Sequence, residues 1–307
     1  MTQRLQWDID GKHWPHRAHS RFVEAAGLRW HVQLVGQENS ALPVALLLHG
    51  TGASTHSWRG LIPQLTPHFS VLSLDLPGHA FTSMPSGGAA STQMSLPGMA
   101  KAIGELLAVL AVKPALMIGH SAGAAIAVRM ALDGLTIDGL PPKHIVSING
   151  ALQPLGGLAG QVFSPVAKLM SALPFVPALF ASQARQPAVL QKLIDSTGSQ
   201  LDAEGMALYA QLVSSPGHAA GALGMMANWD LPQLALDLPR LQAPLSLIVA
   251  SHDRTVPPRQ ATRLRALWPT SAALAKPQLI TLPGLGHLAH EEQPELVARH
   301  ILKLVNP

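Results

Sequence analysis

The stretch Ala115-Leu-Met-Ile-Gly-His-Ser-Ala-Gly-Ala-Ala125 decides how this chain folds. The apolar run Ala115–Ile118 is typical of a strand buried on both faces of a parallel sheet, and the small residues of Ala122–Leu132 predict a helix. Between them, Gly119-His-Ser-Ala-Gly123 matches G-x-S-x-G, a sharp strand-to-helix turn that raises a serine hydroxyl at the strand's carboxyl end. Larger side chains at the two glycine positions would clash with neighbouring backbone, and the helix N-terminus favours developing negative charge. The pattern predicts Ser121 as a nucleophile; the alternative is a Gly/Ser turn with a capping serine.

Strand-like and helical segments alternate along most of the chain. A hairpin pattern covers residues 20–36, and residues 1–19 form an arm without clear period. Alternation of this kind implies βαβ units and a mostly parallel sheet. Further strands are expected at Val44–Leu48, Phe69–Leu74, His144–Ile148, Leu245–Ala250 and Gln278–Leu282, and helices from about Trp58, over Ser95–Leu110, near Arg259–Leu267 and over Glu292–Leu304.

Residues 151–228 break this pattern. They contain no convincing strand, carry few charges and are rich in Ala, Leu, Met, Pro and Gly, so several short helices are expected. The 307 residues are enough for two ordinary domains. A helical segment between two strands is instead interpreted as a lid: residues 1–150 and 229–307 form the α/β core, and residues 151–228 form a helical cap.

A serine hydroxyl is a poor nucleophile near neutral pH and needs a general base that is itself oriented by an acid. On this kind of sheet the chain order is Ser, then Asp or Glu, then His. Asp253 directly follows the strand at 245–250, and His287 lies in Pro283-Gly-Leu-Gly-His287 between the last strand and the last helix. We expect Asp253 as the acid and His287 as the base. The alternatives are a turn aspartate ahead of Pro257 and a solvated loop histidine.

An oxyanion needs two convergent backbone N–H donors. Ala122, immediately after the nucleophile, supplies one. His49-Gly-Thr-Gly52 follows an apolar strand, and the Thr51 N–H is the second donor that we expect. His49 is interpreted as a brace for this loop, and Asp75, in Asp75-Leu-Pro-Gly-His79, as a structural turn residue.

Composition excludes several other classes of function. The basic residues behind the net charge of +4 are scattered, so no nucleic-acid partner is expected. The chain has no cysteine, and His287-Leu-Ala-His290-Glu-Glu292 lacks further ligands at zinc spacing, so neither a metal nor another cofactor is expected. Only 12% of residues are charged, which leaves open a large core, an apolar ligand pocket or contact with a membrane surface.

The N-terminal residues do not look like a signal peptide, and no run of about 18 apolar residues marks a spanning helix. A cytoplasmic protein without a transmembrane segment is therefore expected, with peripheral membrane contact left open.

Several strings together resemble known proteins: Leu28-Arg-Trp-His-Val32, Leu48-His-Gly-Thr-Gly-Ala-Ser-Thr-His-Ser-Trp58, Asp75-Leu-Pro-Gly-His79 and Gly119-His-Ser-Ala-Gly123. They are similar to the α/β-hydrolase superfamily, and most of all to the BchO-type magnesium-chelatase accessory proteins of bacteriochlorophyll biosynthesis. The resemblance implies an eight-stranded sheet with the cap between strands six and seven, and a flat, largely apolar tetrapyrrole as ligand. Ala80 departs from the pattern, because a glycine often completes this turn.

Three hypotheses follow. The first is a serine hydrolase that cleaves an ester or related acyl bond of an apolar substrate, linked to bacteriochlorophyll synthesis. The second is a non-catalytic protein on the same fold that holds a porphyrin or assists magnesium-chelatase subunits. The third is a carboxylesterase or C–C hydrolase outside pigment synthesis. The shape of the cap decides the substrate pocket, and the sequence alone does not specify it.

Overall fold

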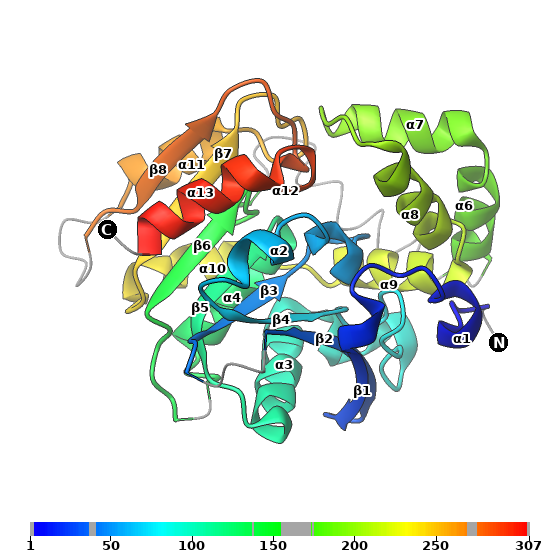
Figure 1. Cartoon of the computed structure of the whole chain (residues 1–307), viewed down its shortest axis with the longest axis horizontal. Helices are drawn as coiled ribbons and strands as arrows, with labels where there is room; N and C mark the ends of the chain where they lie inside the picture. Colours follow the sequence, from blue (N-terminus) through cyan, green and yellow to red (C-terminus); the bar gives the residue numbers. More distant parts are fainter. Residues whose placement is uncertain are drawn as a thin grey trace.

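The computed structural model describes residues 3–36, 41–136, 138–154, 173, 175–268 and 275–305. Its centre is an eight-stranded sheet with the order β1-β2-β4-β3-β5-β6-β7-β8 (Figure 1). The first two strands form the predicted antiparallel hairpin, β2 pairs antiparallel with β4, and all later pairs are parallel. The strands are β1 (Ser20–Ala25), β2 (Leu28–Val35), β3 (Val44–Leu48), β4 (Ser70–Leu74), β5 (Pro114–His120), β6 (His144–Ile148), β7 (Leu245–Ala250) and β8 (Gln278–Leu282).

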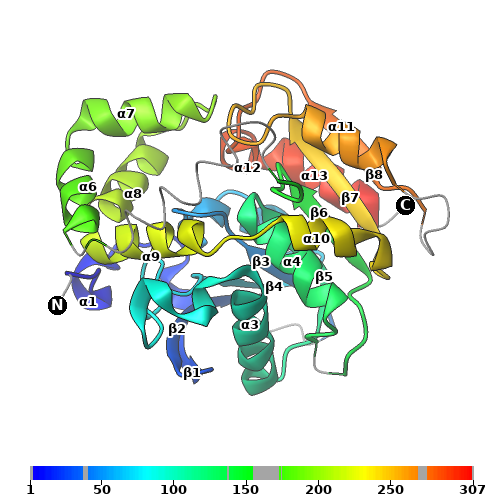
Figure 2. The same cartoon turned by 180° about the vertical axis from the view of Figure 1, so that it is seen from behind.

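Helices cover both faces of this sheet, as the unbroken apolar strands predict. Alternate residues of β3 show the division: Leu46 and Leu48 pack on one side, and Ala45 and Leu47 on the other. The first side carries α3 (Leu96–Leu110), α4 (Ala122–Leu132), α10 (Pro232–Asp237) and α11 (Arg259–Ala266). The second carries α2 (Ile62–Leu65) and α13 (Pro294–Val305), which lie in front in Figure 1 and behind in Figure 2. The predicted mostly parallel, eight-stranded α/β sheet is confirmed.

The helix predicted from Trp58 is wrong in detail. The chain forms a 3₁₀ turn over Thr55–Trp58, and then α2, a single turn that carries Pro63 near its start. Proline is tolerated at the first turn of a helix but lacks the N–H that a continuous helix would need there, so the two turns stay separate.

The N-terminal arm is held by aromatic packing. It contains α1 (Trp7–Asp10) and a 3₁₀ turn over Arg17–His19. Phe81 makes T-shaped contacts with the rings of Trp7 and Trp14, each at a centroid distance of 4.9 Å. These residues share a hydrophobic cluster with Leu208 and Leu212, so the arm also contacts the helical region between β6 and β7.

The described residues of that region form four helices before α10: α6 (Val176–Ala184), α7 (Pro187–Ser196), α8 (Ala203–Val213) and α9 (Pro216–Ala227). The first three lie beside the sheet, at the right in Figure 1 and at the left in Figure 2. The assignment of residues 151–228 to a cap remains a prediction, and residues 155–172 and 174 of it lie outside the described residues. In the described chain, no helix is both long and apolar enough to span a bilayer.

Candidate active site

Ser121 occupies the apex of a strained turn between β5 and α4. Its backbone angles are φ 52° and ψ −117°, a conformation that costs energy for any residue with a side chain. Its N–H donates to the Ile148 carbonyl oxygen at 3.0 Å, which ties the turn to the end of β6. A Cβ on Gly119 would overlap the backbone of Ala124, and one on Gly123 would overlap the carbonyl oxygen of Leu48. Both flanking glycines are therefore required by close backbone contacts, as predicted.

Asp253 and His287, which follow β7 and β8, meet at a hydrogen bond. The His287 Nδ1–H donates to Asp253 Oδ2 at 2.8 Å, and the carboxylate is fully buried. Asp253 Oδ1 accepts two backbone N–H groups, from Thr255 and Val256, each at 2.8 Å. With one oxygen fixed by two donors and the other facing His287, the carboxylate holds the ring in the tautomer that leaves Nε2 free to accept a proton.

The backbone of His287 is clamped by two further side chains. The His120 Nε2–H and the Asn149 amide both donate to the His287 carbonyl oxygen, each at 2.9 Å. Asn149 also accepts the Ala250 N–H at 2.7 Å, so it links the ends of β6 and β7 to the histidine loop. Sequence reasoning missed both residues. The only signal was the position of each at the carboxyl end of a strand.

Ser121 and His287 line one cavity of about 1050 Å³. This volume is at the upper end of the range of about 300–1,000 Å³ common for small-molecule sites. Within the described residues, no group hydrogen-bonds the Ser121 hydroxyl, so the serine and the histidine line the same cavity without a hydrogen bond between them. Catalytic hydrogen bonds are often long in ligand-free proteins and shorten when substrate binds.

Thr51 and Ala122 line the same cavity as Ser121. The loop that carries Thr51 is fixed from beneath by His49, whose Nε2 accepts the Leu76 N–H at 2.9 Å and whose Nδ1–H donates to the Gly50 carbonyl oxygen at 2.7 Å. Burial lowers the pKa of His49 and keeps its ring neutral, which this pair of bonds requires. His49 therefore acts as a brace for the loop.

Asp75 is part of a second buried pair behind this loop. Burial alone would raise the pKa of its carboxyl group, but the ring of His31 at 2.8 Å and the Thr55 N–H bring the pKa down to about 2. It lies outside the lining of the cavity. Its contacts hold the turn that follows β4 and support a structural role.

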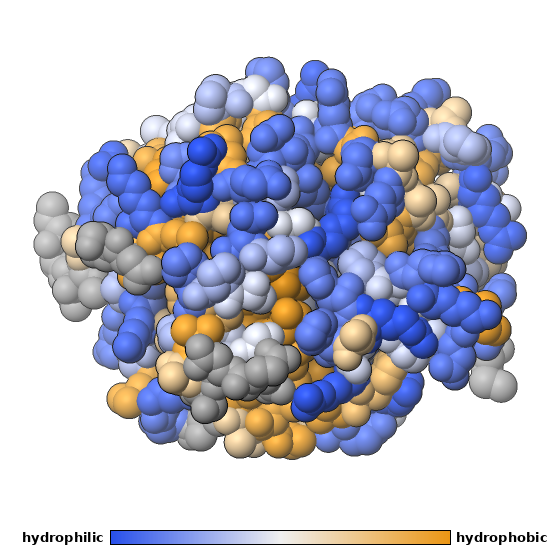
Figure 3. Space-filling model, in the orientation of Figure 1, coloured by the Kyte–Doolittle hydropathy of each residue, from blue (hydrophilic) through white to orange (hydrophobic). Residues whose placement is uncertain are grey.

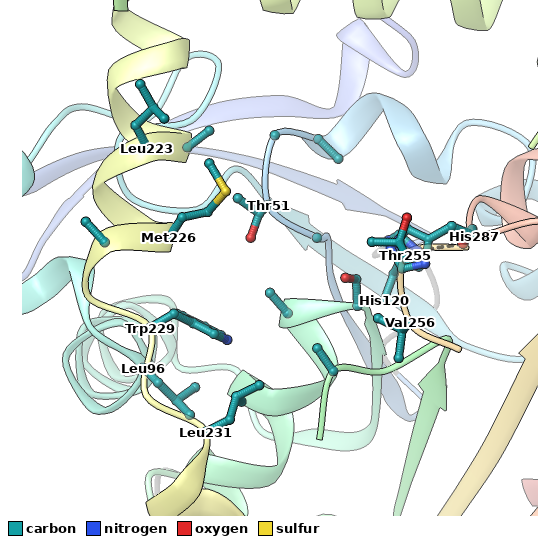
Figure 4. Close-up of a pocket in the computed structure, with 18 of the residues that line it drawn as sticks. Thr51, Leu96, His120, Leu223, Met226, Trp229, Leu231, Thr255, Val256 and His287 are labelled. Atoms are coloured by element: carbon teal, nitrogen blue, oxygen red, sulfur yellow. Dashed lines mark hydrogen bonds between the residues drawn. The ribbon is translucent and has the colours of Figure 1, made fainter. Parts of the chain in front are cut away.

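The walls of the cavity are mainly apolar. Figure 4 shows Leu223, Met226, Trp229 and Leu231 on one side and Thr255, Val256 and His287 across from them. The visible outer face is mostly hydrophilic, with smaller hydrophobic areas between (Figure 3). An apolar interior with a few convergent polar groups suits a ligand that is largely hydrocarbon. Across the described ranges, no group of three His, Asp or Glu side chains could hold a metal ion.

Comparison with known proteins identifies the family to which this fold belongs. Residues 45–300 match the family model described as the alpha/beta hydrolase family. The chain belongs to the alpha/beta hydrolase family. This alpha/beta hydrolase is 38% identical, over 278 residues and 91% of each chain, to the magnesium-chelatase 30 kDa subunit of Rhodobacter capsulatus.

A second relative is the pimeloyl-[acyl-carrier protein] methyl ester esterase of Pectobacterium atrosepticum. It is 26% identical to this alpha/beta hydrolase over 275 residues, which cover 85% of this chain and 94% of the relative. Among solved structures, the enol-lactonase of Burkholderia xenovorans superimposes with a TM-score of 0.70 at 18% identity, covering 94% of this chain and all of the lactonase. At that identity, the likeness supports the fold alone.

Proposed function

We propose that this protein is a serine esterase that hydrolyses an ester, or a related acyl bond, of a bulky apolar substrate. The observation that carries the proposal is that His287, hydrogen-bonded to Asp253, lines the same large apolar cavity as a strained Ser121. A structural turn has no need for a strained serine at a cavity wall, and strain of this kind gathers at functional sites.

In the proposed reaction, Ser121 Oγ attacks the carbonyl carbon while His287 Nε2 takes the hydroxyl proton. The carbonyl π electrons move to the oxygen, and the Thr51 and Ala122 N–H groups bind that oxyanion. Asp253 stabilises the imidazolium without being protonated. Collapse of the intermediate breaks the bond to the leaving alkoxide, which takes the proton from His287.

Water then completes the cycle. His287 accepts a proton from a water molecule, whose oxygen attacks the acyl carbon and forms a second oxyanion at the same two N–H groups. When this intermediate collapses, the bond to Ser121 Oγ breaks and the serine regains its proton from His287. Every group in the cycle belongs to this chain, so no cofactor enters the scheme.

Turnover of p-nitrophenyl esters with acyl chains of increasing length tests the proposal. Activity is expected to rise with chain length, since the cavity walls are apolar, and Ser121→Ala is expected to lose on the order of 10⁴-fold in kcat. Ser86→Ala, at an exposed turn outside the cavity, is the matched control and should retain full activity. No serine-dependent turnover of any ester would refute the proposal.

The similarity to the Rhodobacter capsulatus magnesium-chelatase subunit favours a second candidate. In this alternative, the protein holds a tetrapyrrole in the same cavity or assists chelatase subunits in bacteriochlorophyll synthesis, and Ser121 is idle. Porphyrin binding, measured by absorbance and fluorescence quenching, would then survive Ser121→Ala. Complementation of a deletion strain separates the two candidates: wild type and Ser121→Ala restore pigment equally only if the serine is unused.

A further inference from the structure

Helix α9, which sequence analysis places in the cap, packs directly on the turn beneath the active site. Gly221 meets the backbone of Gly78 so closely that a Cβ on Gly221 would overlap the Gly78 carbonyl oxygen. Two facing glycines allow this approach. The helix is therefore fixed against the core at this point, in contact with the turn that follows β4.

His218, on the same helix, connects this turn to the loop of residues 49–53, which we call the oxyanion loop. Its Nε2–H donates to the Gly52 carbonyl oxygen, and its Nδ1 accepts the Ala80 N–H, both at 3.0 Å. Only the neutral ring can make both bonds, because Nδ1 must be unprotonated. Burial lowers the pKa of His218 to about 4, so the ring stays neutral at physiological pH.

Ala80 explains why such a bond is needed. Its φ is 38°, in the left-handed region that favours glycine, and it stands where the resemblance leads one to expect a glycine. A residue with a Cβ is strained in this conformation, because the Cβ comes too close to the following carbonyl oxygen. The hydrogen bond to His218 holds Ala80 in this conformation and anchors the ring from the side opposite to Gly52.

A second contact from α9 reaches the oxyanion loop one residue earlier. The Thr51 hydroxyl donates to the Met225 sulfur at 3.3 Å. Met225 is fully buried, so this acceptor has a fixed place. Two neighbouring residues of the loop, Thr51 and Gly52, are thus both bonded to the same helix, while His49 braces the loop from the core.

We propose that α9 positions the oxyanion hole, with His218 as the main positioning residue. The inference rests on the proposed esterase function, since it takes the Thr51 N–H as an oxyanion donor. The carbonyl of Gly52 belongs to the second peptide unit after the one that contains that N–H, so a shift of the loop at Gly52 turns the donor away from the substrate. The cap helix then belongs to the catalytic machinery as well as to the pocket wall.

Two variants of His218 test the hydrogen bonds separately from the packing. His218→Phe keeps a ring and removes both bonds, whereas His218→Gln retains one acceptor and one donor. Because one misplaced oxyanion donor costs up to about 10²–10³-fold in kcat, we expect His218→Phe to lose about 10–100-fold in kcat with little change in KM. His218→Gln should recover most of the loss. Gln211→Ala, which removes a bond from α8 to the N-terminal arm, is the control and should have normal kcat.

A trifluoromethyl ketone gives a readout that a merely structural role would not change. Its adduct with a serine carries an oxyanion, so its affinity should fall about 10–100-fold in His218→Phe, while the matched methyl ketone keeps its affinity. Equal affinity of wild type and His218→Phe for the trifluoromethyl ketone would overturn this inference alone. Failure of the wild type to form any serine adduct would instead refute the esterase proposal.

If His218→Phe does not fold, Met225→Leu tests whether α9 positions the oxyanion loop. This substitution conserves volume in the core and removes the sulfur acceptor of the Thr51 hydroxyl. We expect a loss of several-fold in the affinity for the trifluoromethyl ketone, with the methyl ketone unaffected. Unchanged affinity for both ketones would contradict the role of α9.

Discussion

Replacing Asp253 with Asn is a sharp test of the histidine tautomer. The Asp and Asn side chains have nearly the same shape, so the effect of the substitution on kcat depends on how the new amide is oriented. Oδ1 of Asp253 accepts the Thr255 and Val256 N–H groups, and Oδ2 faces the His287 Nδ1–H. If the amide oxygen stays with the two backbone donors, the NH₂ group points at Nδ1 and drives the proton of His287 to Nε2.

The opposite orientation is unfavourable. It would turn the NH₂ group toward two backbone donors, and each buried donor without an acceptor costs about 1–3 kcal/mol. The variant therefore holds His287 in the tautomer that cannot accept the serine proton. In a serine protease, the corresponding change lowers kcat by about 10⁴, equivalent to about 5.5 kcal/mol in the barrier, and we expect a similar loss here.

The assay is kcat and KM for a p-nitrophenyl ester, with urea unfolding to show that the variant is folded. Asp195→Asn is the matched control, because Asp195 is exposed and, among the described residues, its carboxylate accepts a hydrogen bond only from the Gln191 amide. It should leave kcat unchanged. A loss of less than about 10-fold in folded Asp253→Asn would refute the role of Asp253 as the orienting acid.

Other predictions concern stability. Gly123→Ala should prevent folding or lower the urea midpoint of unfolding far more than Gly27→Ala. A Cβ on Gly123 meets the Leu48 carbonyl oxygen, whereas Gly27 has open space around it and only a positive φ, which costs about 1–2 kcal/mol for a residue with a side chain. Equal urea midpoints for the two variants would contradict this. Burial lowers the pKa of His290 to about 3. In the unfolded chain this histidine therefore binds a proton near pH 6.5, whereas in the folded chain it stays unprotonated down to about pH 3. The free energy of unfolding falls as the pH drops from about 6.5 toward 3. His290→Leu should reduce this slope by up to about 1.4 kcal/mol per pH unit, and an unchanged slope in urea titrations at several pH values would show that the histidine titrates normally.

Much of the fold could be predicted because its elements depend on local pattern. The hairpin, the strands β7 and β8 and the turn around Ser121 all carry strong signals: a period of two, continuous apolar runs, and glycines where backbone segments touch. The pairing of Asp253 with His287 could be predicted in the same way, because parallel strands bring their carboxyl ends to one edge of the sheet.

What could not be predicted depends on contacts between distant segments. His218 lies 166 residues from Gly52, and nothing near it in the sequence indicates that its two nitrogens meet the oxyanion loop and Ala80. Asn149 and His120 reach the His287 carbonyl oxygen across 138 and 167 residues. For His218, the one local hint was Ala80, an alanine at a glycine position, whose left-handed backbone needed support from elsewhere.

An activated nucleophile at Ser121 would react covalently with a fluorophosphonate, and peptide mass spectrometry would locate the label on the chain. We expect one adduct, on Ser121, formed rapidly by the wild type, slowly by Asp253→Asn and not at all by Ser121→Ala. A folded wild-type protein that takes up no label, or that is labelled at another serine with Ser121 unmodified, would contradict this expectation.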